Sequence, residues 1–144
     1  WEEKGKKEEN SINNSLKEIN KYFKVGTDEE RNAVEKSIGE ELKNVSNFSL
    51  LQNTLKKNIN NNKSSLLFSN FLLKYSNLKT SDIETETLHK LYSMSLKSES
   101  PFVRFEVIQN LKKDEANFGE FSGQISDLKN SEKSELVLEV LKTL

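Results

Sequence analysis

Residues 63–76 read KSSLLFSNFLLKYS, a run in which apolar residues are unusually dense. Its large apolar and aromatic residues are Leu66, Leu67, Phe68, Phe71, Leu72, Leu73 and Tyr75. A helix at the surface of a domain carries such residues along one stripe, whereas these would cover most of the helix circumference. The pattern therefore predicts a helix that has neighbours on nearly all sides and lies at the centre of the fold.

Helical periodicity extends over almost all of the chain beyond residue 10. Apolar residues recur at steps of three and four, and no segment sustains the alternation that is typical of a strand. Eight helices are expected, with starts near residues 11, 28, 46, 63, 82, 101, 117 and 135. The segments Thr27–Glu30 and Ser81–Glu84 have the form of capping boxes, and Pro101 suits the first position of a helix.

The even-numbered helices of this series repeat at a nearly constant interval. Their apolar stripes end at Leu42, Tyr75, Leu111 and Leu144, which are 33, 36 and 33 residues apart. A unit of two helices cannot cover its own apolar face, but it can do so by lying against the next unit. The interval predicts an all-α fold, an α-solenoid of about four antiparallel helix pairs. An ordinary bundle of eight helices could give the same spacing, because helices of this length with short loops recur at about this interval.

Residues 98–111, SESPFVRFEVIQNL, resemble the second half of a HEAT repeat. The matching residues are Pro101, Val103, Arg104 and Leu111, whereas Ser98 stands where that family has an acidic residue. In the other units, the position of Arg104 is held by Glu35, Phe68 and Val137. The resemblance implies a HEAT-like superhelix that binds other macromolecules, but it does not extend to the family's ladder of Asp and Arg residues.

The first ten residues, WEEKGKKEEN, are charged and have no apolar period. They predict a flexible lead-in over residues 1–10, followed by a single helical-repeat domain over residues 11–144. The chain begins with Trp1 instead of Met, so we expect either a mature segment or a fragment of a longer protein.

Composition argues against nucleic acid and membranes as partners. The 22 Lys and Arg residues nearly balance the 23 Asp and Glu residues, so the chain has no strong positive field with which to attract either. Twenty of the 22 basic residues are Lys, whereas phosphate recognition favours the forked donors of Arg. No stretch approaches the roughly 18 apolar residues that a membrane span needs.

The sequence offers few residues for catalysis. It has no Cys and a single His, His89, which we expect at the surface because one imidazole cannot form a zinc site. Paired carboxylates fall at helix starts or on charged faces, where capping and solvation explain them. Gly119 and Gly123 lack the Lys and Ser or Thr of a phosphate loop. We therefore expect no enzyme activity and no catalytic, cofactor-binding or metal-binding residue.

The function predicted from these patterns is a non-enzymatic protein–protein interaction or scaffolding module. Its concave face, lined by the even-numbered helices, would hold a protein segment or a neighbouring domain. The candidate partner-binding residues are Phe102 and Phe105, which flank Val103 and Arg104, and Leu138 and Leu141 on the last helix. The two phenylalanines could also be core residues, whereas the last helix is apolar on more than one side and should be an open end. The alternative is an exported or lipid-tethered helical domain with a structural or assembly role in a bacterial cell envelope, so both cytoplasmic and exported locations stay open.

Overall fold

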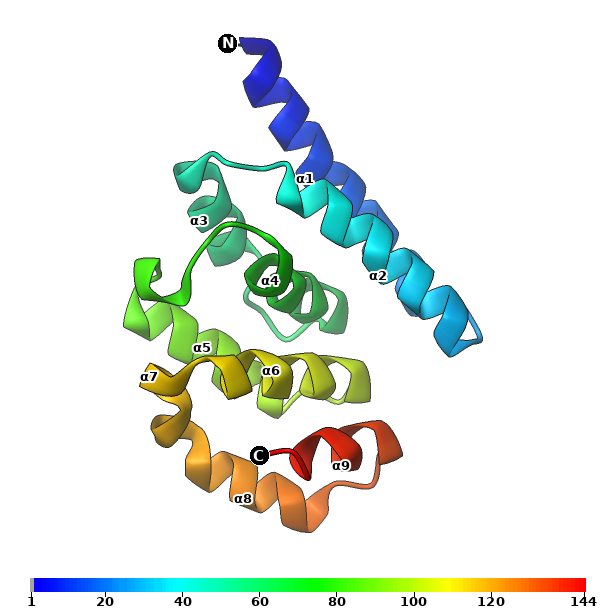
Figure 1. Cartoon of the computed structure of the whole chain (residues 1–144), viewed down its shortest axis with the longest axis vertical. Coiled ribbons are helices and arrows are strands. Elements are labelled where there is room, and N and C mark those ends of the chain that lie inside the picture. Colours follow the sequence, from blue (N-terminus) through cyan, green and yellow to red (C-terminus); the bar gives the residue numbers. More distant parts are fainter. Residues whose placement is uncertain (1) are drawn as a thin grey trace.

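The computed structural model describes residues 2–144, and all of the regular structure in that range is helical (Figure 1). The helices are α1 (Glu2–Tyr22), α2 (Asp28–Lys43), α3 (Phe48–Lys57), α4 (Lys63–Tyr75), α5 (Thr85–Leu96), α6 (Pro101–Lys113), α7 (Glu115–Phe118), α8 (Ser122–Ser131) and α9 (Glu135–Leu141). Two short 3₁₀ turns, η1 (Thr80–Asp82) and η2 (Gly119–Phe121), precede α5 and α8. The all-α prediction is confirmed.

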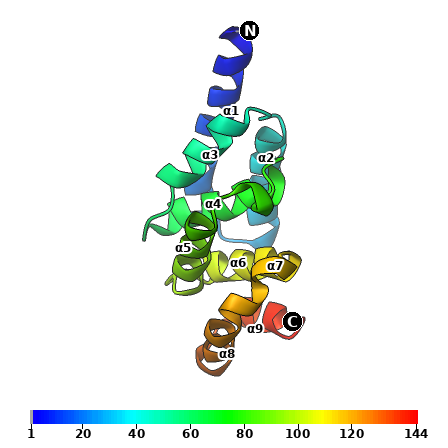
Figure 2. The same ribbon diagram turned by 90° about the vertical axis from the view of Figure 1, so that its left-hand side faces the viewer.

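The helices pack stepwise along the long axis of the molecule. Helix α2 packs on α4, α4 on α6 and α6 on α9, while α1 pairs with α2 and α5 pairs with α6. Figure 2 shows α3, α5 and α8 along one side of this row and α2, α6 and α9 along the other. The two ends of the chain lie at opposite ends of the molecule (Figure 1).

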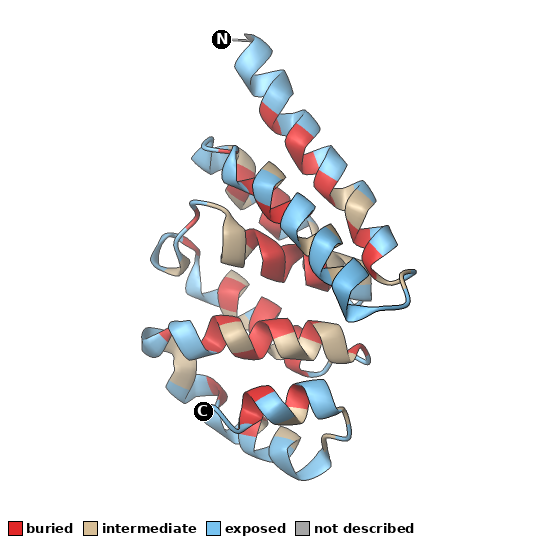
Figure 3. Ribbon diagram, turned by 45° about the vertical axis from the view of Figure 1, so that its right-hand side comes forward, coloured by how far each residue is buried: buried red, intermediate tan, exposed pale blue. Residues whose placement is uncertain are grey.

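Helix α4 lies at the centre, as its sequence predicts. It contacts α1, α2, α3, α5 and α6, and its residues from Leu66 to Leu72 are all buried. Figure 3 shows the buried residues concentrated on α4 and α6, in the middle of the row. A helix covered on so many sides also buries polar residues, and each of these needs a hydrogen-bond partner.

Buried amide groups supply such partners between α4, α5 and α6. The side-chain amide of Asn70 donates to the Leu66 carbonyl (2.9 Å) and to the Ser95 hydroxyl (3.0 Å). Asn110 donates to both the backbone and the side-chain oxygen of Asn70, each at 3.0 Å. Because a slide of α6 along α4 would leave these groups unpaired away from water, the network fixes the register between the two helices.

The predicted lead-in is replaced by regular structure over residues 2–10, which form the first turns of α1. The carboxylate of Glu8 is buried, and it accepts hydrogen bonds from the backbone amide (2.8 Å) and the hydroxyl (2.9 Å) of Ser46. This contact attaches the start of α1 to the loop between α2 and α3, and it explains why a charged segment is held in place. Trp1, which the prediction also covered, lies outside the described residues.

Two other helix starts test the capping predictions. At the first predicted capping box, the hydroxyl of Thr27 accepts a hydrogen bond from the backbone amide of Glu30 at 3.1 Å, so the Thr27 cap is confirmed. The carboxylate of Glu30 accepts a hydrogen bond from the same hydroxyl at 3.0 Å. The second predicted capping box is wrong: η1 occupies Thr80–Asp82 and α5 starts only at Thr85. In η1 the backbone amide of Asp82 bonds to Lys79, and Ile83 is buried next to it, so this segment closes a turn instead of opening a helix.

Candidate functional site

The predicted partner-binding residue Phe102 is half-buried and contributes its ring to a partly buried aromatic cluster. It lies edge-on to Tyr22 with 5.4 Å between the ring centroids, and 6.3 Å from the ring of Phe23. The guanidinium of Arg31 lies 4.8 Å from the centroid of the Phe102 ring, a favourable cation–π geometry. Phe102 therefore joins the start of α6 to the tip of the α1–α2 hairpin. Phe105 is half-buried and packs against the core.

On α9, the structure corrects one predicted partner-binding residue and points to another. Leu141 is only 3% exposed and belongs to the core with Val137 and Val140. These three residues are three and one positions apart, so they form one stripe along the helix, and this stripe packs against α6. Leu138 lies beside this stripe and is half-buried, whereas Leu136 is 38% exposed. The surface of α9 open to a partner is therefore formed by Leu136 and part of Leu138.

A group of charged side chains joins three successive helices of the row. The ammonium of Lys74, on α4, lies 2.8 Å from a carboxylate oxygen of Glu35 on α2 and 3.2 Å from one of Glu106 on α6. It also donates to the side-chain oxygen of Gln109 at 3.3 Å. The hydroxyl of Tyr75 donates to the same oxygen of Glu35. We call Glu35, Lys74, Tyr75, Glu106 and Gln109 the three-helix cluster.

Burial sets the electrostatics of the three-helix cluster. The side chain of Glu106 is 1% exposed, and this burial raises its pKa to about 7, with a further contribution from the charge of Glu35 and opposition from Lys74. Burial works to lower the pKa of Lys74, but the two carboxylates outweigh it, and the pKa of Lys74 lies above its ordinary value. The cluster therefore keeps a cation between a carboxylate and a group that titrates near neutral pH.

A carboxyl group with such a raised pKa is also what a general acid or base needs, so its access to substrate decides between the two roles. A groove of about 350 Å³ runs between α2 and the end of α4, and Glu35 and Tyr75 line it. Glu106 is not among the residues that line this groove. The three-helix cluster thus links α2, α4 and α6 by polar contacts. We call such a polar link between packed elements a joint.

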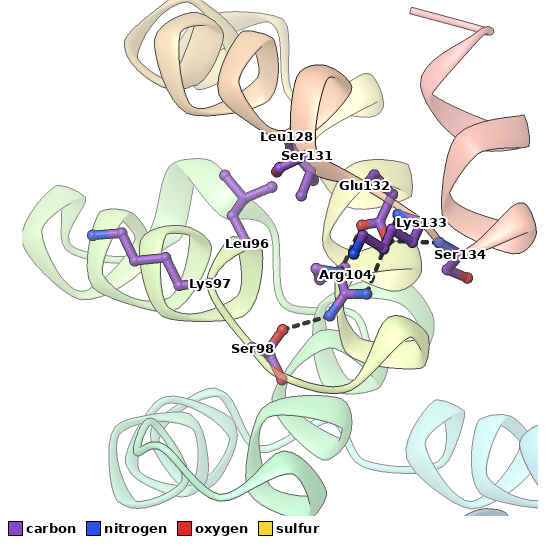
Figure 4. A pocket seen from close by; sticks show the side chains of 9 residues that line it. All are labelled: Leu96, Lys97, Ser98, Arg104, Leu128, Ser131, Glu132, Lys133 and Ser134. Carbon is purple, nitrogen blue, oxygen red and sulfur yellow. Dashed lines mark hydrogen bonds and ion pairs between the residues drawn. The ribbon is translucent and has the colours of Figure 1, made fainter.

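A second joint connects α6 to the loop between α8 and α9, beside an open hollow of about 350 Å³ that is lined by residues of α5, α6, α8 and that loop (Figure 4). Arg104 donates to both carboxylate oxygens of Glu132, at 2.7 and 2.9 Å, and to the Ser98 carbonyl at 2.7 Å. The carboxylate of Glu132 also accepts hydrogen bonds from the backbone amides of Lys133 and Ser134, at 3.1 and 3.0 Å. Burial works to raise the pKa of Glu132, but these hydrogen bonds outweigh it and hold the pKa below its ordinary value. The guanidinium is thus engaged with its own chain on all three nitrogens.

His89 is half-buried, not at the open surface as predicted. Its Nε2 lies 2.8 Å from the side-chain oxygen of Asn117, and its ring lies edge-on to Phe121 at 5.2 Å between centroids. The side-chain amide of Asn117 donates a hydrogen bond to the carboxylate of Asp114. This carboxylate also accepts a hydrogen bond from the hydroxyl of Tyr92 at 2.7 Å. These bonds tie α5 to the junction of α6 and α7, so the imidazole has a structural partner.

Within residues 2–144, no three or more His, Cys, Asp or Glu side chains come together in a way that could hold a metal ion. None of the helices described above is both long enough and apolar enough to cross a membrane.

The fold and its joints define an all-helical protein whose helices pack stepwise. Comparisons with family models, with curated proteins and with solved structures give no match to this chain.

Proposed function

We propose that this protein is a non-enzymatic protein–protein interaction or scaffolding module built from HEAT-like helical repeats, in which about four helix pairs form an α-solenoid. The observation that supports the proposal is the stepwise packing of α2 on α4, α4 on α6 and α6 on α9. In a repeat architecture each unit contacts its neighbours, and the product is an elongated surface suited to binding other proteins.

The polar joints between the steps also support a repeat arrangement. Glu35 and Lys74 connect α2 to α4, Lys74 and Glu106 connect α4 to α6, and Arg104 and Glu132 connect α6 to the start of α9. Each pair links the two elements of one step. A row held at every step presents a surface of defined shape, and a preorganised surface lowers the entropy lost on binding.

The end of the row at α9 is the best candidate for the partner-binding surface. Leu136 is among the most exposed of the large hydrophobic residues. The exposed residues Glu135 and Glu139 lie on the same helix, and the exposed Lys142 follows its last residue. An apolar anchor within a rim of charges of both signs is the usual arrangement of a protein-binding surface, in which the rim sets orientation.

Site-specific photocrosslinking in cells tests this function. The photoreactive residue p-benzoylphenylalanine would replace Leu136, and in a matched control it would replace Lys90, which is exposed on α5. The proposal predicts a protein adduct that is specific to position 136, and its identified partner would then be purified. The Leu136→Asp variant should bind that partner at least tenfold more weakly with unchanged stability. Equal adducts at both positions, or unchanged affinity of the variant, would contradict the proposal.

A further inference from the structure

The three-helix cluster contains more negative than positive charge in a place with little water. Its two carboxylates, on Glu35 and Glu106, share the single ammonium of Lys74. The side chains are 15%, 1% and 20% exposed, respectively. Burying an ion away from water is unfavourable unless its charge is fully compensated, and one ammonium cannot compensate two carboxylates.

We propose that the three-helix cluster is a proton-operated joint: α6 stays packed on α4 and α2 while Glu106 is neutral, and ionisation of Glu106 favours opening of the α4–α6 contact. Opening would admit water to the carboxylate and change the angle between successive steps of the row. The inference goes beyond the proposed function and does not depend on it, because the joint needs no partner to operate.

The hydrogen bonds and the burial explain why Glu106 is the group that changes charge. Glu35 accepts the hydroxyl of Tyr75 in addition to Lys74, and it lies at the groove beside α2. Within residues 2–144, the carboxylate of Glu106 accepts a hydrogen bond from Lys74, at the longer distance of 3.2 Å. The less exposed and less well bonded carboxylate takes up the proton.

Among the charged and titratable groups around Glu106, Glu106 is the one whose charge changes near neutral pH. The surrounding groups are Tyr22 on α1, Arg31 and Glu35 on α2, Lys74 and Tyr75 on α4, and Lys113 on α6 itself. Burial raises the pKa of both Tyr22 and Tyr75, so these phenols stay neutral, and Lys74 stays charged because its pKa is raised as well.

On the other elements next to α6, the titratable groups Tyr92 and Glu132 are engaged elsewhere, and Glu86, Lys90, Glu135 and Glu139 are exposed. On α5, Tyr92 donates to Asp114, and before α9, Glu132 is paired with Arg104. Burial and the charge of Glu35 hold the pKa of Glu106 at about 7, against the opposing effect of Lys74. Small changes around neutral pH therefore change the charge at the α4–α6 contact.

The direction of the effect on stability follows from proton binding. Between the ordinary pKa of 4.5 and about 7, the folded protein holds a proton on Glu106 that the unfolded chain has lost. The ratio of folded to unfolded protein should thus fall as pH rises through this window, by up to tenfold for each pH unit, and level off above it.

Urea unfolding followed by circular dichroism between pH 5 and 8.5 tests the titration. The Glu106→Gln variant keeps the shape of the side chain without its charge, so it should lose this pH dependence and be the more stable protein at pH 8. The Glu40→Gln variant, changed at an exposed position of α2, should keep the dependence of the wild type. If Glu106→Gln fails to fold, Glu35→Gln serves instead, and it should shift the midpoint of the pH dependence to lower pH.

Hydrogen exchange at pH 6 and pH 8, corrected for the intrinsic pH dependence, tests the opening itself. Backbone amides of α6 should lose protection at pH 8 relative to those of α8, and they should not do so in Glu106→Gln. The same pH dependence in Glu106→Gln as in the wild type would overturn the proposal. So would a loss of stability at pH 8 without extra exchange in α6, because Glu106 would then titrate without opening a joint.

Discussion

Replacing Arg104 with Met should weaken the joint between α6 and the loop that precedes α9. The substitution keeps the long side chain but removes the guanidinium that donates twice to Glu132 and once to the Ser98 carbonyl. The carboxylate of Glu132 would stay in place with 2% of its side chain exposed, because the backbone amides of Lys133 and Ser134 still hold it. A charge that was paired would thus become a poorly compensated buried charge.

The loss of stability expected for Arg104→Met lies between two known limits. Exposed ion pairs contribute about 0–1 kcal/mol, whereas removing one partner of a fully buried pair costs about 3–5 kcal/mol. Arg104 is 16% exposed and Glu132 2%, so the pair is close to the buried limit, but the two remaining backbone donors reduce the cost. We expect the free energy of unfolding to fall by about 2–3 kcal/mol. The contribution from the lowered pKa of Glu132 is present above its ordinary value of 4.5 and is lost as pH falls through its folded pKa.

A double-mutant cycle separates the pair from its surroundings. Urea unfolding of wild type, Arg104→Met, Glu132→Gln and the double variant should give a coupling energy of at least about 1.5 kcal/mol. The control is the pair of Lys142 and Glu139 at the end of α9, whose side chains are 72% and 70% exposed. Its coupling should be about 0.5 kcal/mol or less. Equal coupling in the two cycles would refute the view that the buried pair holds α6 to the start of α9.

The other predictions concern packing. In Gly39→Ala, the new Cβ would lie 2.9 Å from a ring carbon of Tyr75, so the variant should be about 1–3 kcal/mol less stable to urea. Gly5→Ala, where nothing lies within 4 Å, should be unchanged or up to about 1 kcal/mol more stable. Leu141→Ala should cost about 2–5 kcal/mol, and Leu136→Ala should stay within about 0.5 kcal/mol of the wild type because its side chain is partly solvated. Comparable losses at Leu136 and Leu141 would contradict the assignment of the core stripe of α9.

The sequence predicts the positions of the helices well because their apolar residues follow the period of a helix. The density of apolar residues between Leu66 and Leu73 also predicts the central place of α4, since only a helix with neighbours on most sides can bury them. Local periodicity, however, says nothing of contacts made far along the chain. The start of α1 is held by Glu8 against Ser46, 38 residues away, and this contact leaves no trace in the first ten residues.

The error at Leu141 has a different cause. The last helix has apolar residues on more than one side, so its sequence allows two core stripes, and the choice between them depends on how α9 meets α6. In the structure, Val137, Val140 and Leu141 form the core stripe of α9, and Leu136 lies outside this stripe.

The three-helix cluster leaves a trace in the sequence that points to burial without naming the partners. On α6 the apolar residues Val103, Val107 and Leu111 define a stripe, and Glu106 and Asn110 fall on the same face because they follow Val103 and Val107 by three residues. A carboxylate at such a position must either be buried or disrupt the stripe, and the structure shows it buried at 1% exposure. Its partner Lys74 lies 32 residues earlier and could be found only from the register between α4 and α6. That register depends on the buried amides of Asn70 and Asn110, so a polar residue on a predicted core stripe indicates a joint, and the stacking of whole helices decides which residue completes it.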